Sequence, residues 1–152
     1  MVMSGYRSRN ALEAATEAHS SIFANFAQYT VGDPLVRAGK RVARIFGEVP
    51  MNEFKYMRFV RAIIDPNKYD AVMSYLNEGV LESLQDVVGL SRVIITRISE
   101  DRLLSASGYI DKTSADAATE AMQNVLAGIT EYMTEPPLIR EGELVWLYQY
   151  NA

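Results

Sequence analysis

The sequence contains no cysteine, and this absence excludes disulfides, thiolate metal sites and cysteine catalysis. It contains one histidine, His19, so a multi-histidine metal site cannot form within one chain. No apolar run approaches the ~18 residues that a membrane-spanning helix requires. The first residues also lack the long apolar stretch of a secretory signal. We therefore expect a cytoplasmic protein with no membrane partner.

Basic residues are in the minority. The chain has 15 Lys and Arg against 19 Asp and Glu, a net charge of -4. This balance disfavours non-specific nucleic-acid binding, which depends on the neutralisation of phosphates. The chain also lacks the glycine-rich loops that cradle phosphates or dinucleotides, and we expect no cofactor. Its 152 residues, 49% of them hydrophobic, can bury a substantial core.

Two segments of the chain resemble each other. Residues 4–45 align without a gap with residues 107–148, and 15 of the 42 aligned positions are identical. The identities include Ser-Gly-Tyr, Ala-Ala-Thr-Glu-Ala and a Pro-Leu-x-Arg-x-Gly pattern. Chance would give about two or three identities at ordinary residue frequencies. We infer an internal repeat.

The second part of the chain has the pattern of a complete α+β unit. Residues 56–64 read as a strand, and Asp65-Pro66 is a strong helix start. The helix is weakened at Gly79, and strands are predicted over 92–98 and 103–110. An alanine-rich helix and a strand over 143–150 complete the order β-α-β-β-α-β. This is the ferredoxin-like order, in which two helices cover one face of an antiparallel sheet.

The first copy supplies only β-α-β, with its last strand over 40–46. We divide the chain into a half-repeat (1–46), a linker (47–55) and a complete ferredoxin-like domain (56–152). Either the chain starts partway through a two-domain precursor, or the protein works as one and a half units. The half-repeat lacks the strand that separates its own two strands in this topology. It must therefore borrow a strand from its own complete domain or from a partner chain.

These features resemble the dimeric α/β-barrel superfamily, and within it the antibiotic-biosynthesis-monooxygenase-like domains. The resemblance lies in the strand 57–64, Asp65-Pro66, the Gly-Leu-Ser-Arg-Val-Ile-Ile run at 89–95 and Ser-Gly-Tyr at 107–109. It covers residues 56–150 completely and 1–46 as half a domain. The resemblance implies two sheets packed face to face, by dimerisation or by tandem duplication. It also implies activities that range from cofactor-free oxidation of polyketide quinols to haem degradation.

Five residues are candidates for ligand binding: Tyr109, Trp146, Arg58, Arg61 and His19. The tyrosine and tryptophan could stack on an aromatic ligand, and one arginine could clamp an anionic group. The two arginines are predicted on opposite faces of one strand. The histidine could be a haem ligand or a general base. Each residue also has a structural interpretation, as a packing aromatic, a paired arginine or a hydrogen-bonded helix histidine.

The predicted last strand indicates whether the sheet is covered by a partner chain. Trp146 and its alternate neighbours are apolar on one face, and Val145 and Leu147 occupy the other. A strand that is apolar on both faces is covered on both sides. The domain's own helices can cover one side, so we predict a homodimer through the sheet faces.

The sequence leaves the catalytic residues, and the question whether the protein is an enzyme at all, open. One hypothesis is a small-molecule-binding dimeric α/β-barrel protein without assigned activity. A second is a cofactor-independent monooxygenase that acts on an aromatic, polyketide-like substrate. A third is a haem-binding or haem-degrading protein that uses His19.

Overall fold

The computed structural model describes residues 3–26, 29, 31–32 and 35–147, with side chains at all of these except 17–19, 21–23 and 26. The chain divides into two compact units, residues 1–37 and residues 38–152. Within the described residues of the first unit, the helix α1 (Arg9–Phe26) is the main element. The hydroxyl of Ser8 caps it by accepting a hydrogen bond from the Ala11 amide at 3.1 Å.

The second unit is built on one antiparallel sheet of five strands. The strands are β1 (Lys40–Phe46), β2 (Tyr56–Ile63), β3 (Leu90–Arg97), β4 (Arg102–Tyr109) and β5 (Leu138–Glu143). Their order across the sheet is β1-β3-β4-β2-β5. Strands β2 to β5 have the ferredoxin-like arrangement, and β1 extends the sheet at the β3 edge. The predicted α+β, ferredoxin-like fold is confirmed.

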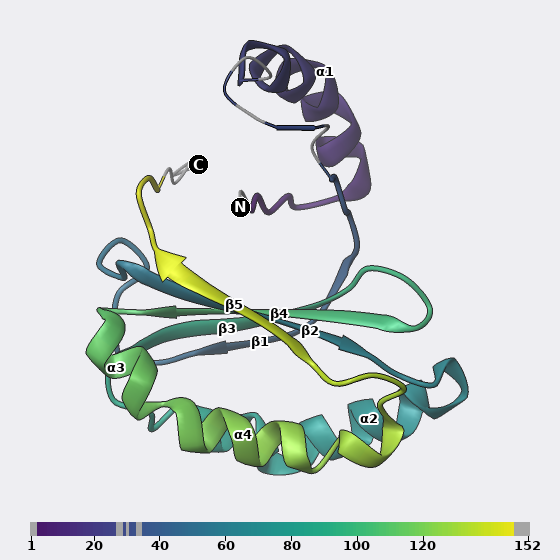
Figure 1. Cartoon of the computed structure of the whole chain (residues 1–152), viewed down its shortest axis with the longest axis vertical. Coiled ribbons are helices and arrows are strands. Elements are labelled where there is room, and N and C mark those ends of the chain that lie inside the picture. The colour runs from purple at the N-terminus through teal and green to yellow at the C-terminus, as the bar shows by residue number, and fades with distance from the viewer. Residues whose placement is uncertain (1–2, 27–28, 30, 33–34, 148–152) are drawn as a thin grey trace. The chain divides into compact units, whose positions relative to one another are not determined.

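All helices of this unit lie on one face of the sheet (Figure 1). The first connection contains a 3-10 turn (Pro66–Lys68), α2 (Tyr69–Tyr75), a π-helical segment (Leu76–Val80) and a second 3-10 turn (Glu82–Leu84). The second contains α3 (Lys112–Ala117), α4 (Thr119–Ala127) and the 3-10 turn Thr130–Tyr132. We call the sheet face under these helices the helix face and the other the open face. None of the described helices is long and apolar enough to cross a membrane.

Local signals place the helices as predicted. The Asp65 carboxylate accepts a hydrogen bond from the Asn67 amide at 2.9 Å, with proline in the next position. The predicted weak point at Gly79 is a true interruption, because Gly79 has φ +88° and Glu78 is also non-helical. Glycine reaches this left-handed conformation at little cost.

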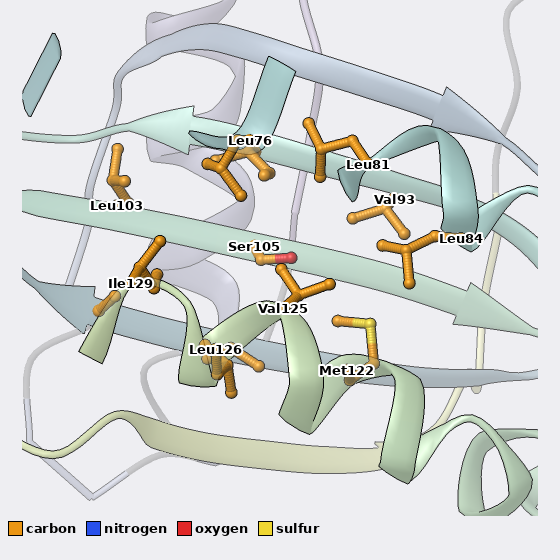
Figure 2. A pocket seen from close by; sticks show the side chains of 13 residues that line it. Leu76, Leu81, Leu84, Val93, Leu103, Ser105, Met122, Val125, Leu126 and Ile129 are labelled. Carbon is orange, nitrogen blue, oxygen red and sulfur yellow. The ribbon is translucent and has the colours of Figure 1, made fainter. Parts of the chain in front are cut away.

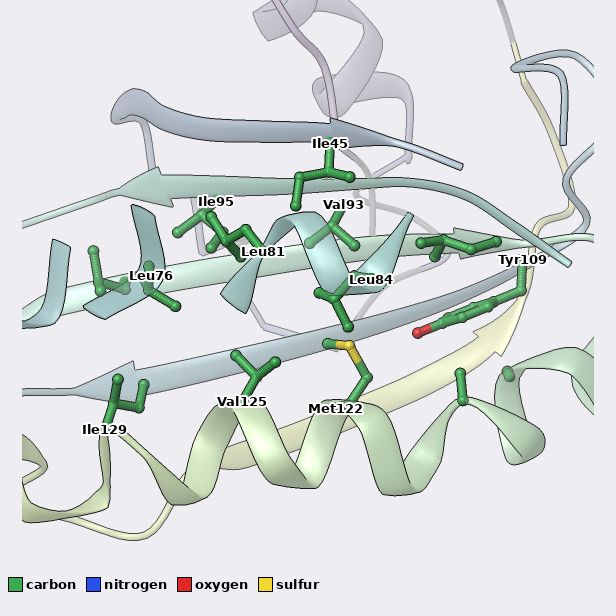
Figure 3. Close-up of a cluster of buried hydrophobic side chains, with 14 of the residues drawn as sticks. Ile45, Leu76, Leu81, Leu84, Val93, Ile95, Tyr109, Met122, Val125 and Ile129 are labelled. Atoms are coloured by element: carbon green, nitrogen blue, oxygen red, sulfur yellow. The ribbon is translucent and has the colours of Figure 1, made fainter. Parts of the chain in front are cut away.

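The core lies between the sheet and its helices. Val72, Leu84 and Val93 are among its most buried side chains. Figure 3 shows Leu84 next to Met122 of α4. The strands alternate accordingly: β2 has the burial pattern of one buried residue followed by one half-buried residue along its whole length. The helix face is thus mainly apolar.

The strand at 40–46 is found where it is predicted. It runs antiparallel to β3, with Arg44 opposite Ile94 and Phe46 opposite Arg92. β1 therefore pairs with a strand of the same compact unit, and the half-repeat stays a prediction. The proposed domain boundaries at 46 and 56 stay a prediction, since the compact units divide between Arg37 and Ala38.

The prediction for the last strand is wrong. The strand spans Leu138–Glu143, residues 144–147 are not in a strand, and 148–150 lie outside the described residues. β5 is an edge strand whose six residues are all exposed, so it lacks the apolar alternation that identifies a buried strand. The predicted strand corresponds to the apolar run that follows β5 in the sequence. Because residues 144–147 are not in a strand, this part of the chain does not require a partner sheet to cover a second face.

Candidate functional site

Arg58 is the buried charged side chain of the helix face, at 6% exposure. Its Nε donates a hydrogen bond to the Glu141 carboxylate on β5 at 2.9 Å. One terminal nitrogen, Nη2, donates to the Ala115 carbonyl at 2.9 Å and to the Thr119 hydroxyl at 3.1 Å. Arg58 thus ties β2 to the edge strand and to the junction of α3 and α4. A buried guanidinium is tolerated because it is paired and hydrogen-bonded.

Tyr109 lies beside this arginine and is fully buried. The Arg58 guanidinium carbon is 5.7 Å from the centre of the Tyr109 ring. Burial raises the pKa of Tyr109 above its usual value, while the nearby Ser107 hydroxyl and the Arg58 charge act in the opposite direction. The phenol is therefore neutral at physiological pH, and its hydroxyl is available as a hydrogen-bond donor.

Two hydroxyls in this region have no hydrogen-bond partner among the described residues: those of Tyr109 and Ser107. Buried hydroxyls in proteins are nearly always satisfied by protein groups, water or a ligand. Both come from β4 at alternate positions, so they face the helices together. These two hydroxyls are polar groups, without a hydrogen-bond partner among the described residues, in a layer that is mainly apolar.

An apolar cavity of about 40 Å³ lies in the same layer. Its walls come from the sheet, the π-helical segment and α4, and Ser105 is its one polar residue (Figure 2). In Figure 3 the hydroxyl end of Tyr109 points toward Leu84 and Met122, which both line this cavity. The cavity is large enough for a water molecule or a small apolar group. The Tyr109 hydroxyl thus lies toward one end of this cavity.

A surface groove of about 540 Å³ lies on the outside of the same helices. It runs between the π-helical segment, with Glu78 and Gly79, and α4, with Asn124 and Val125. Val125 is 9% exposed and lines both the groove and the inner cavity. One side chain therefore forms part of the wall between the two spaces.

Among the predicted site residues whose side chains are described, the structure brings Arg58 and Tyr109 together. Arg61 lies on the open face, so the two arginines do occupy opposite faces, as predicted. Trp146 lies beyond β5 and is 72% exposed, so it is not part of a strand as predicted. His19 lies in α1, and its side chain is outside the described residues. The haem hypothesis therefore stays a prediction.

Sequence reasoning missed the other members of the site. Glu141 is the charge partner of Arg58, although 83 positions separate them. Ser105 and Ser107 alternate with Tyr109 on one strand, and this period-two pattern was a usable signal. Thr119 gave no such signal, because its role depends on where Arg58 reaches the α3–α4 junction.

No family model matches this sequence, and no curated protein does. Solved structures do match. The "Putative monooxygenase" of Fusobacterium nucleatum has a TM-score of 0.67 at 12% identity, over 91% of this chain and 64% of its own. A dimeric ferredoxin-like protein from an uncultured marine organism has a TM-score of 0.54 at 14% identity, over 66% and 96%. A monooxygenase from the gene ActVA-Orf6 of Streptomyces coelicolor, in complex with Nanaomycin D, has a TM-score of 0.56 at 10% identity, over 66% and 96%.

Proteins described as antibiotic biosynthesis monooxygenases are also among the matches, again below 20% identity. At such identities the likeness concerns the fold alone. The chain has the ferredoxin-like fold of these solved structures.

Proposed function

We propose that the protein binds a small, largely apolar molecule with one hydrogen-bonding oxygen, in the layer between the sheet and its helices. The observation that carries this proposal is the pair of buried hydroxyls, Tyr109 and Ser107, without a partner in the described residues. A phenol or ketone oxygen would satisfy them, and the apolar cavity would take the rest of the ligand. Ligand pockets typically combine apolar walls with a few convergent polar groups.

The volume of the cavity limits the size of the ligand that this conformation can bind. A cavity of about 40 Å³ cannot hold an aromatic ring system, whose pockets are commonly ~300 Å³ or larger. Binding of such a ligand would require Val125 and the π-helical segment to move outward, which would join the cavity to the groove. The segment is suited to this motion because its helical hydrogen bonding is interrupted at Glu78 and Gly79.

The test is titration of the full chain with nanaomycin D, the ligand named for the Streptomyces protein. We expect saturable binding that weakens about tenfold in Tyr109→Phe, because the variant loses one hydrogen bond in a dry site. Tyr69→Phe, a tyrosine under Arg97 rather than Arg58, is the matched control and should bind as the parent does. Equal affinity in all three proteins would overturn the role of Tyr109, and no binding would speak against this class of ligand.

A cofactor-independent monooxygenase is the second candidate. The fold neighbours that carry the name monooxygenase favour it, together with a cationic side chain beside a buried phenol. The reaction would convert an activated aromatic CH₂ and O₂ into a ketone and water, with the substrate as the electron source. Arg58 would stabilise the substrate's enolate, and Tyr109 would orient its oxygen. Incubation with anthrone under oxygen would then give a product in which one oxygen replaces two hydrogens.

We further propose that the chain forms a homodimer through the open faces of two sheets, which would build the dimeric α/β barrel. Apolar residues run through the middle of that face, among them Phe59, Ile94 and Leu104. A fold neighbour described as a dimeric ferredoxin-like protein supports the same arrangement. The half-repeat would contribute to this assembly by extending the sheet with β1.

A further inference from the structure

The open face is strongly basic although the chain as a whole is acidic. The strand registers place its side chains in three rows across the sheet. The rows are Arg41–Thr96–Leu104–Arg61–Leu138, Arg44–Ile94–Ala106–Phe59–Arg140 and Phe46–Arg92–Gly108–Met57–Gly142. They contain five arginines and no Asp or Glu, in a chain whose net charge is -4.

None of these five arginines forms an ion pair with the part of the chain that the structure describes. Arg44 lies over the Phe46 ring at 4.5 Å, and Arg92 lies over the Phe54 ring at 4.9 Å. Within the described residues, Arg140 donates to the backbone carbonyl of Ile139 at 3.1 Å. The Nε of Arg61 is buried without a hydrogen-bond partner among the described residues. The positive charge of this face is thus not neutralised by acidic side chains of the described residues.

Dimerisation would increase the repulsion between these positive charges. Packed sheets lie roughly 10 Å apart, so two copies would bring their guanidinium groups into one narrow layer. Desolvated like charges require counter-charges. The strands cannot supply them, because Glu141 and Glu143 point to the helix face, in register with Arg58 and Tyr56.

We propose that the open face is a binding site for a multivalent oxyanion of the oligophosphate class, and that two copies share one anion. This inference rests on the proposed homodimer. Guanidinium forks match phosphate oxygens and donate two hydrogen bonds at once. Arg61 and Arg140 come from neighbouring strands, whereas Arg44 lies four strand spacings from Arg140, roughly 19 Å away. Charges spread over that distance suit a linear oligophosphate better than a single phosphate.

The first experiment measures the dimer dissociation constant of the full chain by light scattering, in chloride, sulfate and tripolyphosphate at the same ionic strength. We expect tripolyphosphate to tighten the dimer by roughly tenfold relative to chloride, within the usual range for a coupled ligand. Equal constants in the three salts would mean that general screening is sufficient, and would overturn the proposal.

Variants assign the effect to the face. Arg61→Gln and Arg140→Gln should each lose most of the tripolyphosphate effect, and should dimerise at least as tightly as the parent in chloride because repulsion is reduced. Arg97→Gln is the control, since it removes the same charge from a residue that is stacked on Tyr69 at 3.7 Å. A loss of the same size in Arg97→Gln would overturn the assignment to the open face.

Calorimetric titration with tripolyphosphate separates this inference from the homodimer on which it rests. Binding heat that disappears in Arg61→Gln supports the anion site even if every solution contains only monomer, in which case the homodimer alone is wrong. The absence of binding heat, with a dimer present in all salts, overturns the anion site and leaves the homodimer standing.

Discussion

Arg58 links two features that the sequence keeps far apart, the edge strand and the helix junction. Its charge is almost completely buried, but its partner Glu141 is 35% exposed at the side chain. Removal of one member of a buried pair is costly because the remaining charge is left in a poor solvent. Exposure of the partner reduces that cost, since water can reach the vacated position.

We therefore predict that Glu141→Gln lowers the free energy of unfolding by about 1–3 kcal/mol, less than the loss of a partner from a fully buried pair. Glu143→Gln lies two residues on, on the same side of β5 and without an ion pair to the described residues, and should change stability by less than about 0.5 kcal/mol. Urea unfolding of both variants is the measurement. Equal effects of the two would show that the Arg58 pair contributes nothing specific.

Tyr109 has a counterpart, Tyr6, in the internal sequence repeat, but the sequence does not predict how deeply each tyrosine is buried. Ser-Gly-Tyr occurs at 4–6 and again at 107–109. Only the second copy lies at the end of a central strand, where its tyrosine is fully buried beside Arg58. Tyr6 belongs to the other compact unit and is half-buried. Identical residues thus have different environments, since Tyr109 ends a strand of the sheet and residues 4–6 are not in a strand.

At the scale of elements, β1 depends on two glycines at its ends. A Cβ at Gly39 or Gly47 would meet backbone atoms of β3, the Arg97 carbonyl or the Leu90 carbonyl. The chain approaches so closely that the Gly47 amide donates to the Ser91 carbonyl at 2.9 Å. Glycine is required here for close approach and not for an unusual backbone angle.

Gly47→Ala should therefore weaken the attachment of β1, at a cost of about 1–3 kcal/mol, as expected for overpacking against a rigid backbone. Hydrogen exchange would show the loss first in the amides of 40–46. Gly142→Ala in β5 is the control, because its Cβ would meet nothing within 4 Å. If both variants keep the protection of β1, the close approach at Gly47 is not a constraint.

The elements that were predicted well have local causes. The Asp65 cap, the interruption at Gly79 and the four strands β1 to β4 follow from side chains adjacent in sequence or from period-two alternation. The last strand failed for the opposite reason. The identity of β5 depends on its pairing with β2, which joins Glu141 to Arg58, and an exposed edge strand leaves no apolar pattern in the sequence.

For the whole molecule, the distribution of charge matters more than its sum. The helix side carries acidic residues such as Asp70, Glu82 and Glu120, while the rows of the open face carry only arginines among their charged residues. A net charge of -4 conceals this separation. Any assembly through the open face should therefore depend on the anions in solution.

We predict a homodimer of about 34 kDa, twice 17.0 kDa, in a sulfate buffer. Phe59→Arg adds a charge to the middle of the open face and should shift the mass toward 17.0 kDa. Ser83→Arg adds the same charge to the helix side and should leave the dimer intact. Light scattering over a concentration series is the measurement. A mass of 17.0 kDa for the parent at every concentration would contradict the face-to-face dimer.

By itself, the sequence determined the element order, the helix starts, the interruption at Gly79 and the opposite faces of Arg58 and Arg61. These properties depend on neighbours along the chain, which periodicity and capping describe. Only the tertiary structure decided that β1 pairs with β3, that Glu141 meets Arg58 and that five arginines share one face. Each of these results requires the order and register of the strands, because backbone pairing is what brings residues from distant parts of the chain into contact.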